Sequence, residues 1–184
     1  AELFFNNVKV PRETLLGELN RGFYHLMHAL AEDRLIGACG YIANAEAAFN
    51  ETLEYVGDRK VFGKPIAEFQ NTRFQLADMR TELDVGYAFI DRCVMAHNEG
   101  KLSAEDAAKA KLWTSELEGR VPDACVQLHG GNGYMMEYRV CRRHAAARVS
   151  RIYAGTSEIL REIISRSLGL DPRRKQNRSR KDEA

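Results

Sequence analysis

Helical periodicity, almost unbroken after Gly22, is the feature that most restricts how these 184 residues can fold. Apolar and small residues recur at three- and four-residue spacing, as in helices that bury one face. The pattern predicts three long helices and two shorter ones, at about 23–56, 69–99, 103–129, 136–149 and 157–168. Because short connections between long helices make neighbours antiparallel, the chain is predicted to be all-α, an antiparallel up-and-down bundle of four-helix type.

Breakers and caps mark where these helices begin and end. Gly100 can take the left-handed conformation that closes the second helix, and Gly169 does the same for the last one. Ser103 and Asp106 form a capping-box pattern, which is typical of a helix start. Pro122 lies inside the third helical pattern. Because proline lacks an amide hydrogen, we expect a kink or a local break there.

The two ends of the chain differ from its middle. Residues 3–11 are rich in β-forming residues with partial alternation and end at Pro11, so a short strand is predicted there. One strand cannot form a sheet, so its partners must lie elsewhere. Residues 171–184 are highly charged and lack aromatic residues, and we expect them to be disordered.

The composition argues against several classes of function. The formal net charge is only +1, whereas nucleic-acid binding usually needs a strong basic excess, so no nucleic-acid partner is expected. No apolar run reaches membrane-spanning length and no secretory leader is visible, so no membrane partner is expected. The cysteines are widely spaced without a Cys-x-x-Cys pair. They are interpreted as buried thiols in a reducing compartment, and no metal site is expected.

Two glycine-bearing helix junctions carry the strongest signal for a bound ligand. Residues 127–134 have the sequence QLHGGNGY, and residues 152–160 have the sequence IYAGTSEIL. Glycine leaves the backbone accessible, and the free amides at a helix start favour phosphate oxygens. Two such junctions on one bundle predict contacts with phosphates and with the ring amides of a cofactor.

These two segments resemble the C-terminal domain of the acyl-CoA dehydrogenases, flavoproteins that desaturate acyl-CoA thioesters. The resemblance implies FAD as cofactor, an acyl-CoA substrate, electron-transfer flavoprotein or a similar acceptor, and a homo-oligomer, either a dimer or a tetramer. It implies a cytoplasmic location, or the mitochondrial matrix in a eukaryote.

The same resemblance implies a domain organisation. Residues 1–18 would be the end of a middle β-domain plus a linker, residues 19–170 the helical bundle, and residues 171–184 a charged tail. The predicted N-terminal strand would be left over from that preceding β-domain. Two interpretations stay open: a fragment that lacks its N-terminal half, or one subunit of an enzyme whose other half is encoded separately.

Asp33 is the candidate catalytic residue on the first long helix. It shares the stripe of Leu26, Leu30, Gly37 and Gly40, which we expect to face inward. A carboxylate there needs a partner or a ligand, because burying an unpaired charge is costly. The pattern alone leaves open whether the partner is an ion pair within the helix or a substrate, although adjacent helical residues do not face each other.

The resemblance implies that Asp33 is the base. Many members of the family carry a catalytic glutamate before a Gly-Thr pair, where this chain has Ala154. The isovaleryl-CoA and long-chain branches instead use the acid of a Glu-Arg-Leu sequence on the first bundle helix, which matches Asp33, Arg34 and Leu35. Aspartate is shorter than glutamate by one methylene, which is roughly 1.5 Å of reach.

Further contacts follow from the same resemblance. An Arg-Lys-x-Phe-Gly turn begins at Arg59, and a guanidinium fork suits the oxygens of a pyrophosphate. The implied flavin contacts are Arg59, Gln70, Gln127, Leu128, His129, Gly130, Gly131, Thr156, Ser157 and Glu158. The implied substrate contacts are Tyr24, Arg34, Ala154 and Gly155. The segment 127–131 is commonly used for a cofactor that a neighbouring subunit holds.

Two alternatives to the dehydrogenase remain. One is a related flavoprotein oxidase or monooxygenase on the same fold, in which an acyl-CoA base is dispensable. The carboxylate at Asp33 argues mildly against it. The other is a helical assembly protein without catalysis, which predicts that the complete gene product carries no flavin.

Overall fold

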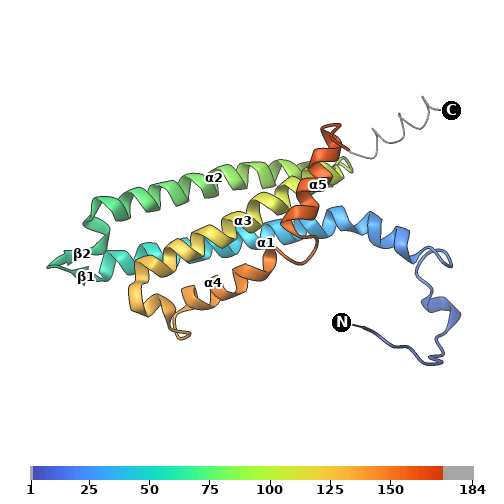
Figure 1. The fold of residues 1–184 in the computed structure, drawn as a ribbon, viewed down its shortest axis with the longest axis horizontal. Helices are drawn as coiled ribbons and strands as arrows, with labels where there is room; N and C mark the ends of the chain where they lie inside the picture. Colours follow the sequence, from blue (N-terminus) through green and yellow to red (C-terminus); the bar gives the residue numbers. More distant parts are fainter. Residues whose placement is uncertain (1, 172–184) are drawn as a thin grey trace, which may run out of the picture.

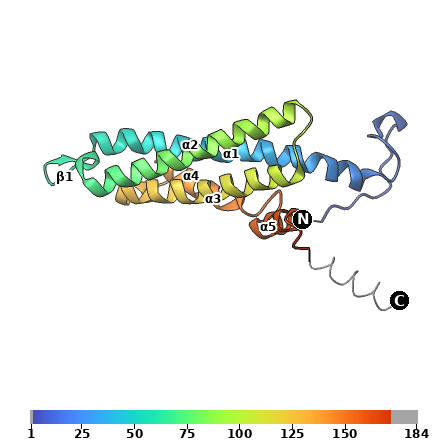
Figure 2. The same ribbon diagram turned by 90° about the horizontal axis from the view of Figure 1, so that it is seen from above.

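The helices α1 (Gly22–Asp58) and α3 (Ala104–His129) lie side by side and form the centre of the molecule (Figures 1 and 2). The helices α2 (Gln70–Asn98) and α4 (Arg139–Ser150) each contact both of them. Chain direction alternates from α1 to α4, as Figure 1 shows, so the predicted all-α up-and-down bundle is confirmed. The short helix α5 (Ser157–Ser167) packs on α3. The computed structural model describes residues 2–171.

Small side chains allow α1 and α3 to approach closely. Ala38, Ala45 and Ala48 of α1 are completely buried, as are Ala107 and Ala110 of α3. Larger apolar residues fill the space around them, and burying each such side chain contributes about 1.5–3 kcal/mol. The large buried residues include Leu35, Ile42, Phe49, Val56, Leu76, Met79, Leu83, Ile90, Leu117 and Val121. Those of α2 recur at three-, four- and seven-residue intervals, as expected from the helical periodicity predicted for residues 69–99.

The inward stripe of α1 differs from the predicted one. Leu26 is exposed, and so are Asp33 and Gly40, whereas Arg34 and Leu35 are buried. The prediction that Asp33 faces inward is therefore wrong. Apolar and small residues occur around most of the circumference of α1, so spacing alone selected a stripe displaced by about one position.

Local helix signals were more informative. The amide of Asp106 donates to Ser103 Oγ at 2.9 Å, which confirms the predicted start of α3. Gly100 has φ +68°, and its amide donates to the His97 carbonyl at 2.9 Å, so the predicted stop of α2 is also confirmed. The helix α3 continues without a break through the buried Pro122, so the predicted break is absent.

A two-residue turn joins the only strands found within residues 2–171, β1 (Lys60–Val61) and β2 (Lys64–Pro65). Its central residues Phe62 and Gly63 have φ +50° and +82°. Two positive φ values match the twist of a tight antiparallel hairpin. This hairpin sits at the end of the bundle where α1 stops and α2 begins, beside Arg59 (Figure 1).

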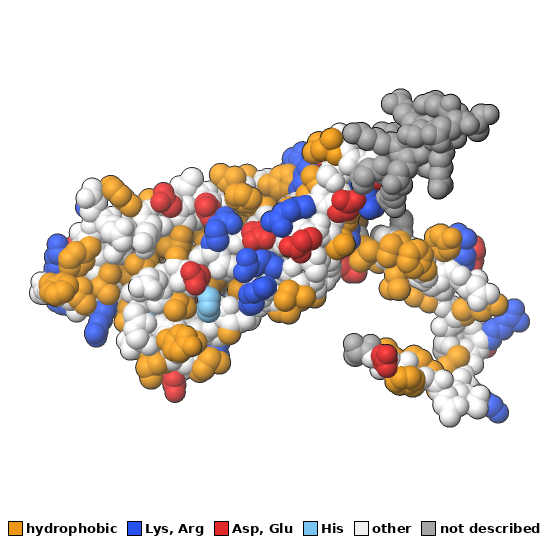
Figure 3. Space-filling view, viewed as in Figure 1, with side chains coloured by type: hydrophobic (Ala, Val, Ile, Leu, Met, Phe, Trp, Pro, Cys, Tyr) orange, Lys and Arg blue, Asp and Glu red, His pale blue; other side chains and the backbone are white. Residues whose placement is uncertain are grey.

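The N-terminal segment does not form the predicted strand. Residues 3–11 are exposed and have no ladder partner within the described chain. This agrees with the physical expectation that an unpaired strand is not stable. Large apolar side chains along this segment face solvent (Figure 3). Phe4 and Phe5 are 86% and 80% exposed. Apart from residue 171, the predicted disordered tail lies outside the described residues.

Candidate functional site

The turn between α4 and α5 lies against α1 and α3 and contains two left-handed residues. Ala154 has φ +53° and Gly155 has φ +100°. The Lys111 ammonium, from α3, donates a hydrogen bond of 2.8 Å to the Gly155 carbonyl oxygen. A Cβ placed on Gly155 would lie 3.8 Å from Arg34 Nη2, so the guanidinium from α1 borders the same turn. Ala154 and Gly155 are therefore held between α1 and α3.

Two buried cations border this turn. Lys111 is completely buried and Arg34 is 7% exposed, and Arg34 Nε has no hydrogen-bond partner within the described residues. Burial lowers the pKa of both groups, and the Arg34 charge lowers the pKa of Lys111 further. The turn therefore lies in a region of positive potential, which favours electron-rich groups.

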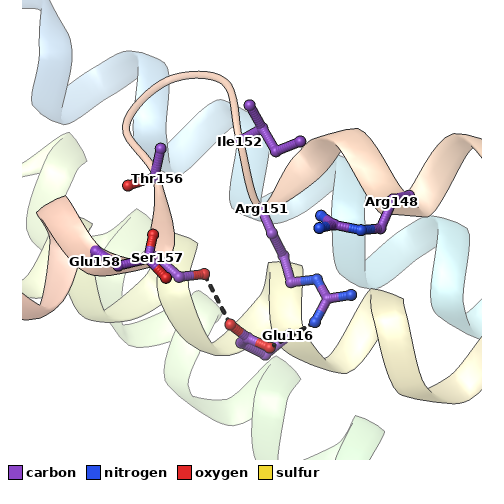
Figure 4. Close-up of a pocket in the computed structure, with 7 residues that line it drawn as sticks. All are labelled: Glu116, Arg148, Arg151, Ile152, Thr156, Ser157 and Glu158. Carbon is purple, nitrogen blue, oxygen red and sulfur yellow. Dashed lines mark hydrogen bonds and ion pairs between the residues drawn. The ribbon is translucent and has the colours of Figure 1, made fainter.

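Glu116 of α3 anchors the start of α5 (Figure 4). Its carboxylate accepts hydrogen bonds from Ser157 Oγ at 2.7 Å, from Arg151 at 3.2 Å and from Arg161 at 3.4 Å. Burial by itself would raise the pKa of Glu116, but the hydrogen bonds from Ser157 and Arg151 outweigh it and lower that pKa. The Thr156 hydroxyl caps α5 by accepting from the Ile159 amide at 3.4 Å.

A pocket of about 170 Å³ opens between Glu116 and this junction. Its lining residues are Glu116, Arg148, Arg151, Ile152, Thr156, Ser157 and Glu158. The hydroxyls of Thr156 and Ser157 are already hydrogen-bonded within the protein, and Ser157 is buried. Glu158 is exposed.

Asp33 lies on the exposed side of α1, one residue before the buried Arg34. Its carboxylate has no hydrogen bond or ion pair with any residue in the described part of the chain. The predicted substrate contact Tyr24 is also exposed, further towards the start of α1. The structure therefore brings Arg34, Ala154 and Gly155 together. Asp33 is next to Arg34 in the sequence, and its carboxylate is free.

The other predicted cofactor residues lie at the opposite end of the bundle. At about 1.5 Å per residue, α1 separates Asp33 from Arg59 by roughly 40 Å. Arg59, Gln70 and Gln127 are exposed, as is the backbone of Gly130 and Gly131. No single ring or phosphate can contact both ends of one chain. The candidate site therefore divides into a turn group near residues 33 and 154–158 and a hairpin group near residues 59, 70 and 127–131.

Next to the hairpin group lies an aromatic cluster that was not predicted from the sequence. The rings of Tyr55 and His129 stack with their centroids 4.1 Å apart, and Tyr138 meets both edge-on. His129 is 6% exposed, so its imidazole packs into this cluster, next to the exposed backbone of Gly130. The sequence signal that could have indicated a role for Tyr55 is its position one helical turn before Arg59.

Comparison with known proteins identifies the domain. Residues 20–169 match the family described as acyl-CoA dehydrogenase, C-terminal domain. The chain belongs to the acyl-CoA dehydrogenase family. It is 46% identical over 171 residues to the mitochondrial long-chain specific acyl-CoA dehydrogenase of Rattus norvegicus, covering 93% of this chain and 40% of that protein. It therefore spans less than half the length of this acyl-CoA dehydrogenase.

Other acyl-CoA dehydrogenase relatives agree. The chain is 38% identical to the caffeyl-CoA reductase-Etf complex subunit CarC of Acetobacterium woodii, covering 90% of this chain and 44% of that protein. The crystal structure of an acyl-CoA dehydrogenase from Geobacillus kaustophilus matches with a TM-score of 0.85 and 45% identity, over 90% of this chain and 43% of that one. The homologous acyl-CoA dehydrogenases are FAD-dependent flavoproteins.

The hairpin group of this acyl-CoA dehydrogenase domain is compatible with FAD. The Arg59 guanidinium has no partner within the described residues and is free to bind a phosphate. A Cβ placed on Gly130 or Gly131 would meet nothing within 4 Å, so the backbone there is open to a ligand.

Residues 2–171 contain no helix with the length and apolar character needed to cross a membrane. The same residues contain no group of three or more His, Cys, Asp or Glu residues suited to hold a metal ion.

Proposed function

We propose that the protein to which this domain belongs catalyses the flavin-dependent α,β-dehydrogenation of acyl-CoA thioesters, with Asp33 as the base. The observation that carries the proposal is the free Asp33 carboxylate beside Arg34, which borders the Ala154–Gly155 turn. By the family resemblance, the acyl thioester would lie against this turn. Because Ala154 has no acidic group, the proton must go to another residue, and Asp33 is the free carboxylate next in the chain to Arg34.

The residues of this chain have separable roles in the proposed reaction. Asp33 accepts the proton from the thioester α-carbon, and the small Ala154 leaves room for the substrate. Lys111 and Glu116 fix the turn and the start of α5 through Gly155 and Ser157. FAD, when bound, supplies the two-electron acceptor that takes the hydride from the β-carbon. Its binding residues on this chain would be the exposed Glu158 and the backbone at Thr156, while the hairpin group of a neighbouring copy would hold its phosphates.

The division into two groups supports a homo-oligomer. Since one chain separates the turn group from the hairpin group by the length of α1, we propose that the hairpin group binds the FAD held mainly by a neighbouring copy. The relative named as an Etf complex subunit supports an electron-transfer flavoprotein, or a similar acceptor, as the partner that reoxidises the flavin.

Turnover of the full-length protein tests this function. The assay uses short, branched and long acyl-CoAs with an artificial electron acceptor, with and without oxygen. The proposal predicts enoyl-CoA formation that depends on the acceptor and not on oxygen. Oxygen-dependent turnover would instead favour an oxidase, and a purified protein without flavin absorbance would overturn the proposal.

A further inference from the structure

Tyr55 connects the two segments of the hairpin group. It lies in the last turn of α1, where its backbone carbonyl accepts the Arg59 amide at 2.9 Å. Its hydroxyl donates to the His129 carbonyl at 3.3 Å and accepts from the Asn132 side-chain amide at 3.0 Å. One residue therefore contacts the start of the Arg59 turn and both sides of the Gly130–Gly131 backbone.

The ring of Tyr55 adds a rigid support to these hydrogen bonds. It stacks on His129 with an interplanar angle of 19°. The His129 imidazole is also held by its own helix, because its Nδ1 lies 2.8 Å from the Cys125 carbonyl oxygen. Stacked rings held by hydrogen bonds have little freedom to move, so the backbone between His129 and Asn132 has a fixed position relative to α1.

The segment after His129 has little room to relax by itself. Gly130 has φ +59°, a conformation that favours glycine. A Cβ on Gly133 would lie 2.3 Å from the Val126 carbonyl oxygen, so this turn packs directly on the end of α3. The hydrogen bonds of Tyr55 to His129 and Asn132 therefore hold a backbone segment that is already tightly packed.

We propose that Tyr55 is a positioning residue, which fixes the distance between the Arg59 guanidinium and the Gly130–Gly131 backbone so that both can hold one FAD. This inference rests on the proposed function. Tyr55 does not itself contact the cofactor: it is half-buried, and its hydroxyl is already used by His129 and Asn132.

The test compares Tyr55→Phe with wild type in the full-length protein. Phenylalanine keeps the stacked ring and removes both hydroxyl hydrogen bonds. We expect the Kd for FAD, from titration of the apo-protein, to rise about tenfold, since a hydrogen bond contributes roughly that factor. Amide hydrogen exchange of residues 129–134 in the apo-protein should also become faster. Asn132→Ala removes one of the same bonds from the other side and should shift both readouts in the same direction.

Tyr87→Phe is the matched control. The Tyr87 hydroxyl donates to Glu46, joining α2 to α1 away from the hairpin group. This variant removes a tyrosine hydrogen bond between helices, and we expect FAD affinity and exchange at residues 129–134 to match wild type.

The outcomes separate this role from the proposed function. If Tyr55→Phe binds FAD within twofold of wild type, or if Tyr87→Phe weakens FAD binding equally, Tyr55 does not position the hairpin group. If the wild-type apo-protein does not take up FAD at all, the proposed function fails together with this role.

Discussion

The Lys111 ammonium donates a 2.8 Å hydrogen bond to the Gly155 carbonyl oxygen, and this bond ties the centre of α3 to the turn that begins α5. Lys111 is completely buried, and its charge lies near that of Arg34. Burying a lysine without a partner costs free energy, and the hydrogen bond to Gly155 offsets part of that cost.

Replacing Lys111 with methionine should loosen this turn without unfolding the domain. Methionine fills a similar volume and removes the cost of burying the charge, but it leaves the Gly155 carbonyl without its donor. Amide exchange at residues 155–157 should become faster, and the KM for acyl-CoA should rise in the full-length protein. Lys109→Met, on the same helix but at a partly exposed lysine, should change neither value. Unchanged exchange in Lys111→Met would show that the bond does not hold the turn.

Glu116 should give the domain a specific sensitivity to acid. Its pKa in the folded protein is lowered from the ordinary value of 4.5, so its stabilising contribution is complete above pH 4.5 and is lost as pH falls through the lowered value. The thermal unfolding temperature of wild type should therefore fall more steeply with decreasing pH than that of Glu116→Gln. The glutamine variant should be less stable at neutral pH. Parallel curves for the two proteins would contradict the sign of this shift.

Ala154 should tolerate glycine and not valine. A residue other than glycine in the left-handed region costs roughly 1–2 kcal/mol, and Ala154 has φ +53°. Ala154→Gly should keep or increase the free energy of unfolding measured in urea. Ala154→Val should lower it by more than about 1 kcal/mol, because a β-branched side chain at positive φ is strongly disfavoured. A valine variant as stable as wild type would show that this turn is not rigid.

Gly133→Ala should destabilise the end of α3. The added Cβ would lie 2.3 Å from the Val126 carbonyl oxygen and 2.9 Å from His129 Cβ, so the backbone must move. We expect a loss of about 1–3 kcal/mol in the free energy of unfolding. Gly131→Ala is the control, because its Cβ would meet nothing within 4 Å. Equal stability of the two variants would contradict the tight packing of this turn.

Signals that act within a few residues of the chain were read correctly from the sequence. The Ser103 cap, the Gly100 stop and the periodicity of α2 each depend on nearby residues, and each prediction is confirmed. The family resemblance was carried by the order and spacing of short segments, and it too is confirmed.

Features that depend on distant contacts could not be predicted in this way. The buried face of α1 is set by the alanine-rich surface of α3, and the sequence of α1 offers several possible faces. The stacking of Tyr55 on the His129 imidazole was not predicted, because the two residues are far apart in the sequence. The role of the buried Lys111 was not predicted either, because only the fold brings its ammonium to the Gly155 carbonyl.

The central claim is that Asp33 takes the α-proton, and steady-state turnover of three variants tests it most directly. Asp33→Asn should bind FAD normally and lose at least about 10²-fold in kcat, as expected for removal of a general base. Asp33→Glu should retain activity, because the carboxylate is kept, and Glu32→Gln should resemble wild type, because this neighbouring exposed acid is outside the proposed reaction. An Asp33→Asn variant with the wild-type kcat would show that another residue is the base.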